Sequence, residues 1–301
     1  MEDLKQRIDE LKKRKNAVIL AHNYQIEEVQ LIADYLGDSL ELSKIASRIN
    51  NKMIIFAGVK FMAETAKILS PEKTVLLPRL DAGCPMADMI TVDELIELKQ
   101  EHKKAKVVTY VNSSVEIKAE SDVCCTSANA VSVVKNIDAD EVIFIPDRNL
   151  GTYVQKMVPE KRIILFEGYC YVHNRIKKEE IEEMRDLYPE AEFLVHPEAK
   201  MDVINLSDKV FSTSGMLKYA KESNKKQFII ITEQGLIERL KRENPEKEFY
   251  PAKRPKICSN MKRTALIDIF NSLEKNQYEI NIEKSVLKRA YNALSGMLKY
   301  V

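Results

Sequence analysis

The sequence predicts an α/β protein of three units related by a pseudo-threefold axis, each a small parallel sheet with helices on both faces, around a central site. Three observations support this fold class. Helical and strand patterns alternate along the chain, one order of elements occurs three times, and polar residues and cysteines recur at equivalent positions.

Each copy begins with a charged amphipathic helix, which we expect over residues 3–14, 92–104 and 178–188. An apolar, β-rich segment follows each helix, at residues 17–21, 107–111 and 192–195. Polar groups then stand where each strand should end, and they are His22-Asn23-Tyr24, Tyr110-Val111-Asn112 and His196-Pro197-Glu198. Because parallel α/β sheets bind ligands beyond the carboxyl ends of their strands, these groups are candidates for one site.

A hydroxyl residue heads the next amphipathic helix in the same register in every copy. The distance from the first polar residue to this hydroxyl is 17 residues, and the pairs are His22 and Ser39, Tyr110 and Ser127, and His196 and Thr213. Ser and Thr are common N-cap residues, which is the ordinary explanation for any single copy. Three such helix N-termini directed at one cavity would instead favour an anion that carries phosphate or carboxylate groups.

A further strand, a helix and a short last strand complete each copy and lead to a cysteine. The further strands are expected over residues 53–57, 141–145 and 227–231, and the helices after them end near Pro71, Pro159 and Pro245. Cys84 and Cys258 lie 62 residues after the first polar residue of their copies, and Cys170 lies 60 residues after. Three of the five cysteines therefore share one repeat position.

The repeat also suggests the domain organisation. We place the units at residues 1–87, 88–173 and 174–260, followed by a C-terminal helical tail at 261–301 that should pack across the assembly. No Gly-rich or low-complexity linker separates the units, so they should pack tightly around one site.

Composition excludes several classes of partner. Lys and Arg number 47 and Asp and Glu 46, so the net charge of +1 offers no basic surface to hold nucleic acid. The N-terminus lacks a signal-peptide pattern, and the apolar runs are far shorter than the roughly 20 residues that span a bilayer. We therefore expect a cytoplasmic protein with neither a nucleic-acid nor a membrane partner.

The cysteines indicate a metal centre rather than disulfides, because they are odd in number and widely scattered. Three thiolates brought together by the pseudo-threefold axis could hold zinc with an open fourth position, or a 4Fe-4S cluster with one iron lacking a protein ligand. Spacing leaves both open, but the absence of C-x2-C pairs argues against a structural zinc module or an electron carrier. The adjacent pair Cys124 and Cys125 lies outside the register and is expected to be structural.

The central site should also contain groups suited to proton transfer near neutral pH. They are the imidazoles of His22 and His196, the phenols of Tyr24 and Tyr110, the amide of Asn112 and the carboxylate of Glu198. His173, three residues after Cys170, has no counterpart in the other copies. It is expected to orient the metal ligands through hydrogen bonds rather than to bind the metal itself.

Several motifs taken together are specific, and they extend over essentially the whole chain. They are Leu20-Ala-His-Asn-Tyr-Gln25, Gly37-Asp-Ser39, Tyr110-Val-Asn112, Thr126-Ser-Ala-Asn-Ala130, Pro146-Asp-Arg-Asn-Leu150, His196-Pro-Glu198 and Ser212-Thr213. In these motifs the chain resembles the quinolinate synthase family. The resemblance implies a three-unit α/β fold around a 4Fe-4S cluster, with the family's three cysteine ligands matching Cys84, Cys170 and Cys258.

The resemblance also implies an activity and a set of site residues. The family condenses iminoaspartate (iminosuccinate) with dihydroxyacetone phosphate, with loss of phosphate and water, to give quinolinate, the precursor of the NAD pyridine ring. The enzyme that supplies iminoaspartate is then an implied partner. Substrate-binding residues by similarity are His22, Ser39, Tyr110, Asn112, Ser127, His196, Glu198 and Thr213. Catalytic candidates are Tyr24 and Glu198 for proton transfer, together with His22 and Tyr110, while the open iron would act as a Lewis acid.

Two other functions stay open at this stage. One is a zinc-dependent lyase or hydrolase that acts on an anionic substrate through the same thiolates. The other is a non-catalytic anion-binding protein with a structural metal, although a passive binder has little need of Tyr, Glu and His together. The chain also departs from the family pattern at Ala199, where the family often has a cysteine, so no ligand can be required at that position.

Overall fold

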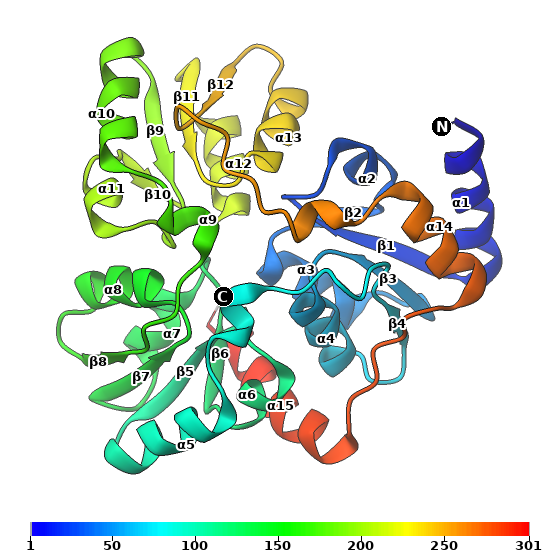
Figure 1. Cartoon of the computed structure of the whole chain (residues 1–301), viewed down its shortest axis with the longest axis horizontal. Coiled ribbons are helices and arrows are strands. Elements are labelled where there is room, and N and C mark those ends of the chain that lie inside the picture. The colour runs from blue at the N-terminus through cyan, green and yellow to red at the C-terminus, as the bar shows by residue number, and fades with distance from the viewer. Residues whose placement is uncertain (1, 301) are drawn as a thin grey trace.

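The structure is a computed structural model, and it describes residues 2–300. Within that range the chain forms three four-stranded parallel sheets, which Figure 1 shows as three lobes around a common centre. The strands of the first sheet are β1 (Ala17–His22), β2 (Tyr35–Gly37), β3 (Met53–Ala57) and β4 (Thr74–Leu76). Those of the second are β5 (Lys106–Tyr110), β6 (Val123–Cys125), β7 (Glu141–Ile145) and β8 (Arg162–Leu165). Those of the third are β9 (Glu192–Val195), β10 (Lys209–Val210), β11 (Gln227–Ile231) and β12 (Glu248–Pro251).

The three sheets have one topology, with the first strand of each unit paired between its second and third strands. The orders are β2-β1-β3-β4, β6-β5-β7-β8 and β10-β9-β11-β12. This confirms the predicted fold class. Each sheet lies within one of the ranges 1–87, 88–173 and 174–260, and we propose these ranges as the boundaries of the folded units.

Helices flank every sheet, as buried strands in parallel sheets require. The first unit has α1 (Glu2–Lys15), α2 (Glu27–Ile32), α3 (Ser39–Arg48) and α4 (Lys60–Leu69). The second has α5 (Val92–Glu101), α6 (Val115–Ala119), α7 (Ala130–Asn136) and α8 (Arg148–Met157). The third has α10 (Lys178–Leu187), α11 (Met201–Asn205), α12 (Thr213–Glu222) and α13 (Gly235–Glu243), and the short α9 (Tyr171–Asn174) leads into it from the second unit. Helix α5 is three residues shorter than predicted, because the non-helical backbone of His102 ends it.

The repeat extends to partly buried hydrogen bonds that the sequence did not suggest. In each unit an aspartate before the second strand accepts a backbone N–H from the first strand, and its other oxygen pairs with a basic side chain. The N–H contacts are Asp34 to Ile19 at 2.7 Å, Asp122 to Val107 at 2.8 Å and Asp208 to Phe193 at 2.8 Å. These contacts fix the edge strand of each sheet against its neighbour.

Each of the prolines Pro71, Pro159 and Pro245 begins a Pro-Glu-Lys segment, and the three segments have an equivalent role in their units. Their lysines donate to carbonyls at the C-terminal ends of α3, α7 and α12, where a cation also interacts favourably with the helix dipole. The contacts are Lys73 to Ile49, Lys161 to Ile137 and Lys247 to Ser223. Each segment therefore caps the helix that begins beside the central site.

The C-terminal tail packs against two units. Helix α14 (Leu266–Lys275) lies on α1 and β3, and α15 (Lys284–Met297) lies on α6, β6 and α4. Figure 1 shows this last helix, in red, inserted beside the second unit. Between the two helices, Glu279 pairs in antiparallel fashion with Leu76 and so extends the first sheet beyond β4. Among the described residues, no helix has the length and apolar character that crossing a membrane requires.

Candidate active site

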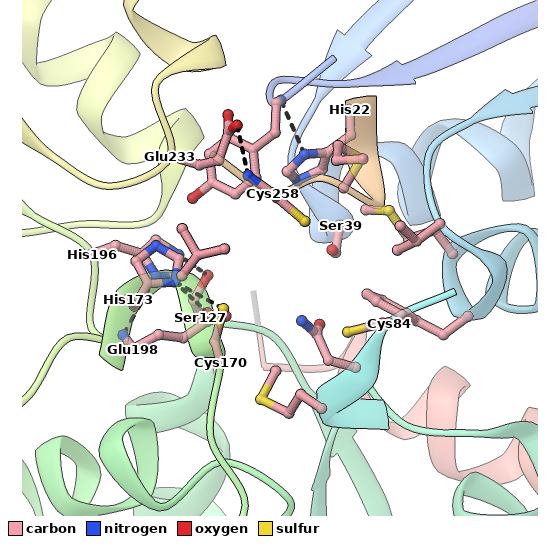
Figure 2. Close-up of a pocket in the computed structure, with 18 of the residues that line it drawn as sticks. His22, Ser39, Cys84, Ser127, Cys170, His173, His196, Glu198, Glu233 and Cys258 are labelled. Atoms are coloured by element: carbon pink, nitrogen blue, oxygen red, sulfur yellow. Dashed lines mark hydrogen bonds and ion pairs between the residues drawn. The ribbon is translucent and has the colours of Figure 1, made fainter. Parts of the chain in front are cut away.

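One pocket lies where the three units meet, and all the residues predicted for the site line it (Figure 2). They are His22, Tyr24, Ser39, Cys84, Tyr110, Asn112, Ser127, Cys170, His196, Glu198, Thr213 and Cys258. The topology explains this convergence, since His22 ends β1, Tyr110 ends β5, and His196 directly follows β9. The carboxyl ends of these three equivalent strands point at one centre.

A continuous chain of short hydrogen bonds crosses the pocket wall. Tyr24 Oη lies 2.5 Å from Thr232 Oγ1, and His173 Nε2 lies 2.8 Å from the same hydroxyl. His173 Nδ1 lies 2.7 Å from Glu198 Oε2, and the Tyr110 hydroxyl donates to Glu198 Oε1 at 2.5 Å. All five side chains are buried, so the chain is shielded from bulk water.

The surroundings determine which of these groups are charged. Burial would raise the pKa of Glu198, but its interactions with His173, His196 and Tyr110 outweigh burial and lower the pKa below its ordinary value. Burial, followed by the charge of Glu198, raises the pKa of Tyr24 and of Tyr110 well above the ordinary value. Glu198 is therefore an ionised acceptor, and both phenols hold their protons at neutral pH.

The two predicted histidines are neutral. Burial lowers the pKa of His22 to about 4, against the opposing charge of Asp38. Burial likewise lowers the pKa of His196 to about 3, against the opposing charge of Glu198. Each imidazole can then offer one donor and one acceptor nitrogen, and His196 Nε2 already lies 3.1 Å from Ser127 Oγ.

Three free thiols face the pocket, one from the loop after the last strand of each unit (Figure 2). Burial raises the pKa of Cys84 to about 12 and also raises the pKa values of Cys170 and Cys258. A bound metal centre would have to displace these protons, because the thiolate is the ligand. Cys124 and Cys125, by contrast, lie in β6 with no exposed surface and belong to the hydrophobic core, as expected.

The three pocket thiols can be compared with the spacing that a single zinc ion requires. A tetrahedral zinc with Zn–S bonds of about 2.3 Å needs thiolates roughly 3.8 Å apart. Among residues 2–300, the metal-ligating atoms that lie within 4.8 Å of one another belong to Cys170, His173 and Glu198, and the three cysteine sulfurs do not form such a group. The three thiols are therefore not gathered at the spacing of one zinc ion, whereas Cys170, His173 and Glu198 form a group that could hold a metal ion.

The hydroxyl residues lie at the pocket, but not in the capping role considered from sequence. Ser39 and Thr213 are the first residues of α3 and α12, and the N-caps are Asp38 and Ser212. The expectation that Ser127 heads a helix was wrong: α7 begins at Ala130, and Ser127 lies in the preceding turn, which the Asn129 side chain closes on Thr126. Its hydroxyl therefore contacts His196 rather than a helix end.

Sequence reasoning missed groups that line the pocket or bond to residues that line it. The repeat did not point to Thr232, because the other copies have Gly58 and Pro146 at the equivalent position and neither residue has a hydroxyl. His173 was expected only as a supporting residue, but it is the central link of the hydrogen-bonded chain. The buried Asn112 Oδ1 has no hydrogen-bond partner among the described residues, so a ligand donor in the pocket could satisfy it.

Comparisons with known proteins show which sequences this chain is similar to. A sequence model of the family described as "Quinolinate synthetase A protein" matches residues 6–299. A quinolinate synthase of Alkaliphilus metalliredigens is 53% identical over 292 residues, which cover 97% of this chain and 96% of the relative. The quinolinate synthase of Caldicellulosiruptor saccharolyticus is 50% identical and covers 99% of both chains. That of Thermodesulfovibrio yellowstonii is 52% identical and covers 97% of this chain and 96% of the relative.

Proposed function

Since the chain belongs to the quinolinate synthetase A family, we propose that it condenses iminoaspartate (iminosuccinate) with dihydroxyacetone phosphate to form quinolinate, phosphate and water. The observation that carries the proposal is one pocket that combines three unpaired thiols with a buried chain of proton-transfer groups. Such a reaction in NAD biosynthesis, between small metabolites, suits the cytoplasm and a partner enzyme that supplies iminoaspartate.

Cys84, Cys170 and Cys258 would hold the 4Fe-4S cluster. When bound, its iron without a protein ligand would supply Lewis-acid chemistry for a substrate oxygen. The free thiols and their separation around the pocket support this assignment.

The polar wall of the pocket would bind the substrate carboxylates and phosphate. Ser39, Ser127 and Thr213 offer hydroxyls, and neutral His22 and His196 offer N–H donors. The unsatisfied oxygen of Asn112 would accept a hydrogen bond from a substrate N–H or O–H.

The polarity of the hydrogen-bonded chain explains how Tyr24 can serve first as base and then as acid. Ionised Glu198 only accepts hydrogen bonds, so His173 donates to it from Nδ1. In the tautomer in which Nε2 carries no proton, Nε2 accepts from Thr232, whose hydroxyl in turn accepts from Tyr24. Tyr24 then presents a lone pair, rather than its proton, to the pocket.

One proton reverses this arrangement. A proton taken from substrate at Tyr24 Oη can pass through Thr232 to His173, where Glu198 stabilises the resulting positive charge. The two bonds that link Tyr24, Thr232 and His173 then point the other way, while His173 Nδ1 and Tyr110 still donate to Glu198, and the Tyr24 O–H becomes free to face the substrate. The same residue can return the proton to a leaving hydroxyl, so condensation and loss of water can share one set of groups.

Metal analysis of protein purified without oxygen tests the proposed function. We expect about four iron and four sulfide per chain, as a 4Fe-4S cluster contains. Quinolinate should form when both substrates are supplied. Zinc in a one-to-one ratio with no iron would instead favour the zinc-dependent lyase or hydrolase, and full iron content without turnover would favour the passive anion binder.

Anion binding makes a separate prediction. Inorganic phosphate or a small dicarboxylate should raise the melting temperature, because ligands of the folded pocket stabilise it by about 2.7 kcal/mol at 100 times their Kd. Sodium chloride at equal ionic strength is the control for screening. Ser39→Ala should reduce the protection, since Ser39 lines the pocket at the start of α3 and its hydroxyl could bind an anion there. A melting temperature indifferent to both anions would contradict the assignment of these hydroxyls.

A further inference from the structure

Glu233 is a buried carboxylate beside the pocket to which the proposed reaction gives no role. It lies two residues after β11, and its side chain is only 1% exposed. Burying a carboxylate is costly unless other groups compensate for its charge and its lost hydration. The contacts that Glu233 makes should therefore reveal what it holds in place.

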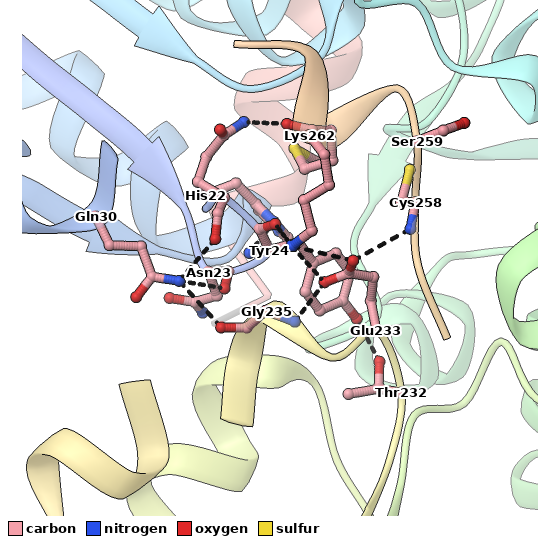
Figure 3. A network of polar contacts seen from close by, with 12 residues as sticks. His22, Asn23, Tyr24, Gln30, Thr232, Glu233, Gly235, Cys258, Ser259 and Lys262 are labelled. Carbon is pink, nitrogen blue, oxygen red and sulfur yellow. Dashed lines mark hydrogen bonds and ion pairs between the residues drawn. The ribbon is translucent and has the colours of Figure 1, made fainter. Parts of the chain in front are cut away.

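Its contacts join three segments that are distant in sequence (Figure 3). Glu233 Oε1 accepts the backbone N–H of Cys258 at 3.1 Å, and Oε2 accepts that of Gly235 at 2.7 Å. Lys262 Nζ lies 3.1 Å from the carboxylate and also donates to the backbone carbonyl of Tyr24. A single ion pair thus connects the loop of the third cysteine with the end of β1 in the first unit.

Gly235 shows how closely these segments approach. A Cβ atom at this position would lie 2.8 Å from Tyr24 O and 2.9 Å from Glu233 Oε2, and it would also meet Lys262 Nζ. Only glycine leaves room for the three groups to meet. Tyr24, Glu233 and Lys262 therefore pack so closely around Gly235 that no larger side chain fits there.

The second unit has a carboxylate at the same repeat position. Asp147 lies two residues after β7, is fully buried, and stands beside the backbone N–H of Cys170. The first unit has Val59 there, so Cys84 lacks such a partner. A carboxylate that faces a cysteine amide recurs in two of the three units, but only Glu233 also binds a lysine that reaches Tyr24.

We propose that Glu233 and Lys262 are positioning residues that hold Cys258 and Tyr24 in a fixed relation to each other. The inference rests on the proposed function, because it takes Cys258 as a cluster ligand and Tyr24 as the proton-transfer residue. Groups that orient metal ligands through hydrogen bonds commonly change metal affinity when they are replaced. Here the same pair would also fix the distance between the cluster and the acid–base group.

The test compares Glu233→Gln with Asp208→Asn in the intact, cluster-loaded enzyme. Asp208 is a matched control in the same unit, since it also accepts a backbone N–H and pairs with a basic side chain, Arg185, but lies outside the pocket. We expect Glu233→Gln to release iron to a chelator roughly 10- to 100-fold faster than wild type, as is typical of groups that support metal ligands. Its kcat should fall while KM changes little, and Asp208→Asn should match wild type in both measurements.

Lys262 gives a second route that does not require removing the buried carboxylate. Lys262→Arg keeps a cation opposite the buried carboxylate and should fold even if Glu233→Gln does not, whereas Lys262→Met removes the charge at a side chain that is 18% exposed. Lys262→Met should lower kcat and speed iron release, and Lys262→Arg should restore most of both, because arginine also pairs with a carboxylate.

The outcomes separate this inference from the proposed function. If wild-type protein purified without oxygen contained no iron, both the proposed function and the positioning role would be excluded. A loaded wild type, together with Glu233→Gln and Lys262→Met variants that match Asp208→Asn in iron release and kcat, would overturn the positioning role and leave the proposed function standing.

Discussion

Replacing Cys84, Cys170 or Cys258 by serine is expected to remove most of the iron and all quinolinate formation. Each cysteine is the single thiol that its unit contributes to the pocket, so any one replacement leaves two thiolates, too few to hold a cluster firmly. The measurement is iron, sulfide and quinolinate production for each variant, prepared without oxygen. Serine keeps the shape of the side chain, so loss of iron would report on ligation rather than on packing.

The other two cysteines are the matched controls. Cys124→Ala and Cys125→Ala should keep the brown chromophore and substantial turnover, because both side chains lie in the core and neither lines the pocket. Each loses a buried sulfur, at a cost of about 1 kcal/mol in the free energy of unfolding. The threefold cluster assignment would be wrong if either one proved indispensable for iron while a pocket cysteine did not.

Tyr24→Phe should reduce quinolinate formation by roughly 100- to 10,000-fold, the contribution typical of a general acid or base. The phenylalanine ring preserves the packing of Tyr24 and removes only the hydroxyl that bonds to Thr232. Iron content and the visible spectrum should therefore stay at wild-type values, which separates a chemical defect from loss of the cluster.

Tyr219→Phe is the control for Tyr24→Phe. The Tyr219 hydroxyl donates to Glu192 at 2.6 Å in the third unit and does not line the pocket, so its removal should leave turnover near that of wild type. Near-normal turnover of Tyr24→Phe would exclude Tyr24 from proton transfer and leave Tyr110 and Glu198 as the groups to examine.

The internal repeat made most of the fold and the pocket predictable. His22, Tyr110 and His196 end equivalent strands of equivalent sheets, so one register locates the functional side chains of all three units. Residues that break the symmetry could not be found this way. The positions equivalent to Thr232 in the other copies are a glycine and a proline. Lys262 lies after the end of the third copy, so it has no equivalent position in the repeat.

Local turn chemistry explains the error at Ser127. The register predicted a helix head at this position, as Ser39 and Thr213 provide in the other units. Asn129 instead accepts the N–H of Thr126 at 2.8 Å and closes a turn that delays the start of α7 to Ala130. Side-chain hydrogen bonds to nearby backbone compete with helix initiation, and spacing alone does not reveal which one prevails.

The path of the tail has a consequence for synthesis on the ribosome. The first sheet is extended by Glu279, and α1 is covered by α14, so the earliest unit to be translated receives its last neighbours from nearly the end of the chain. Until then, the edge beyond β4 and the face of α1 stay exposed to other nascent chains. The second unit likewise waits for α15 to cover α6 and β6. Folding of the first two units is thus completed only after translation of the third.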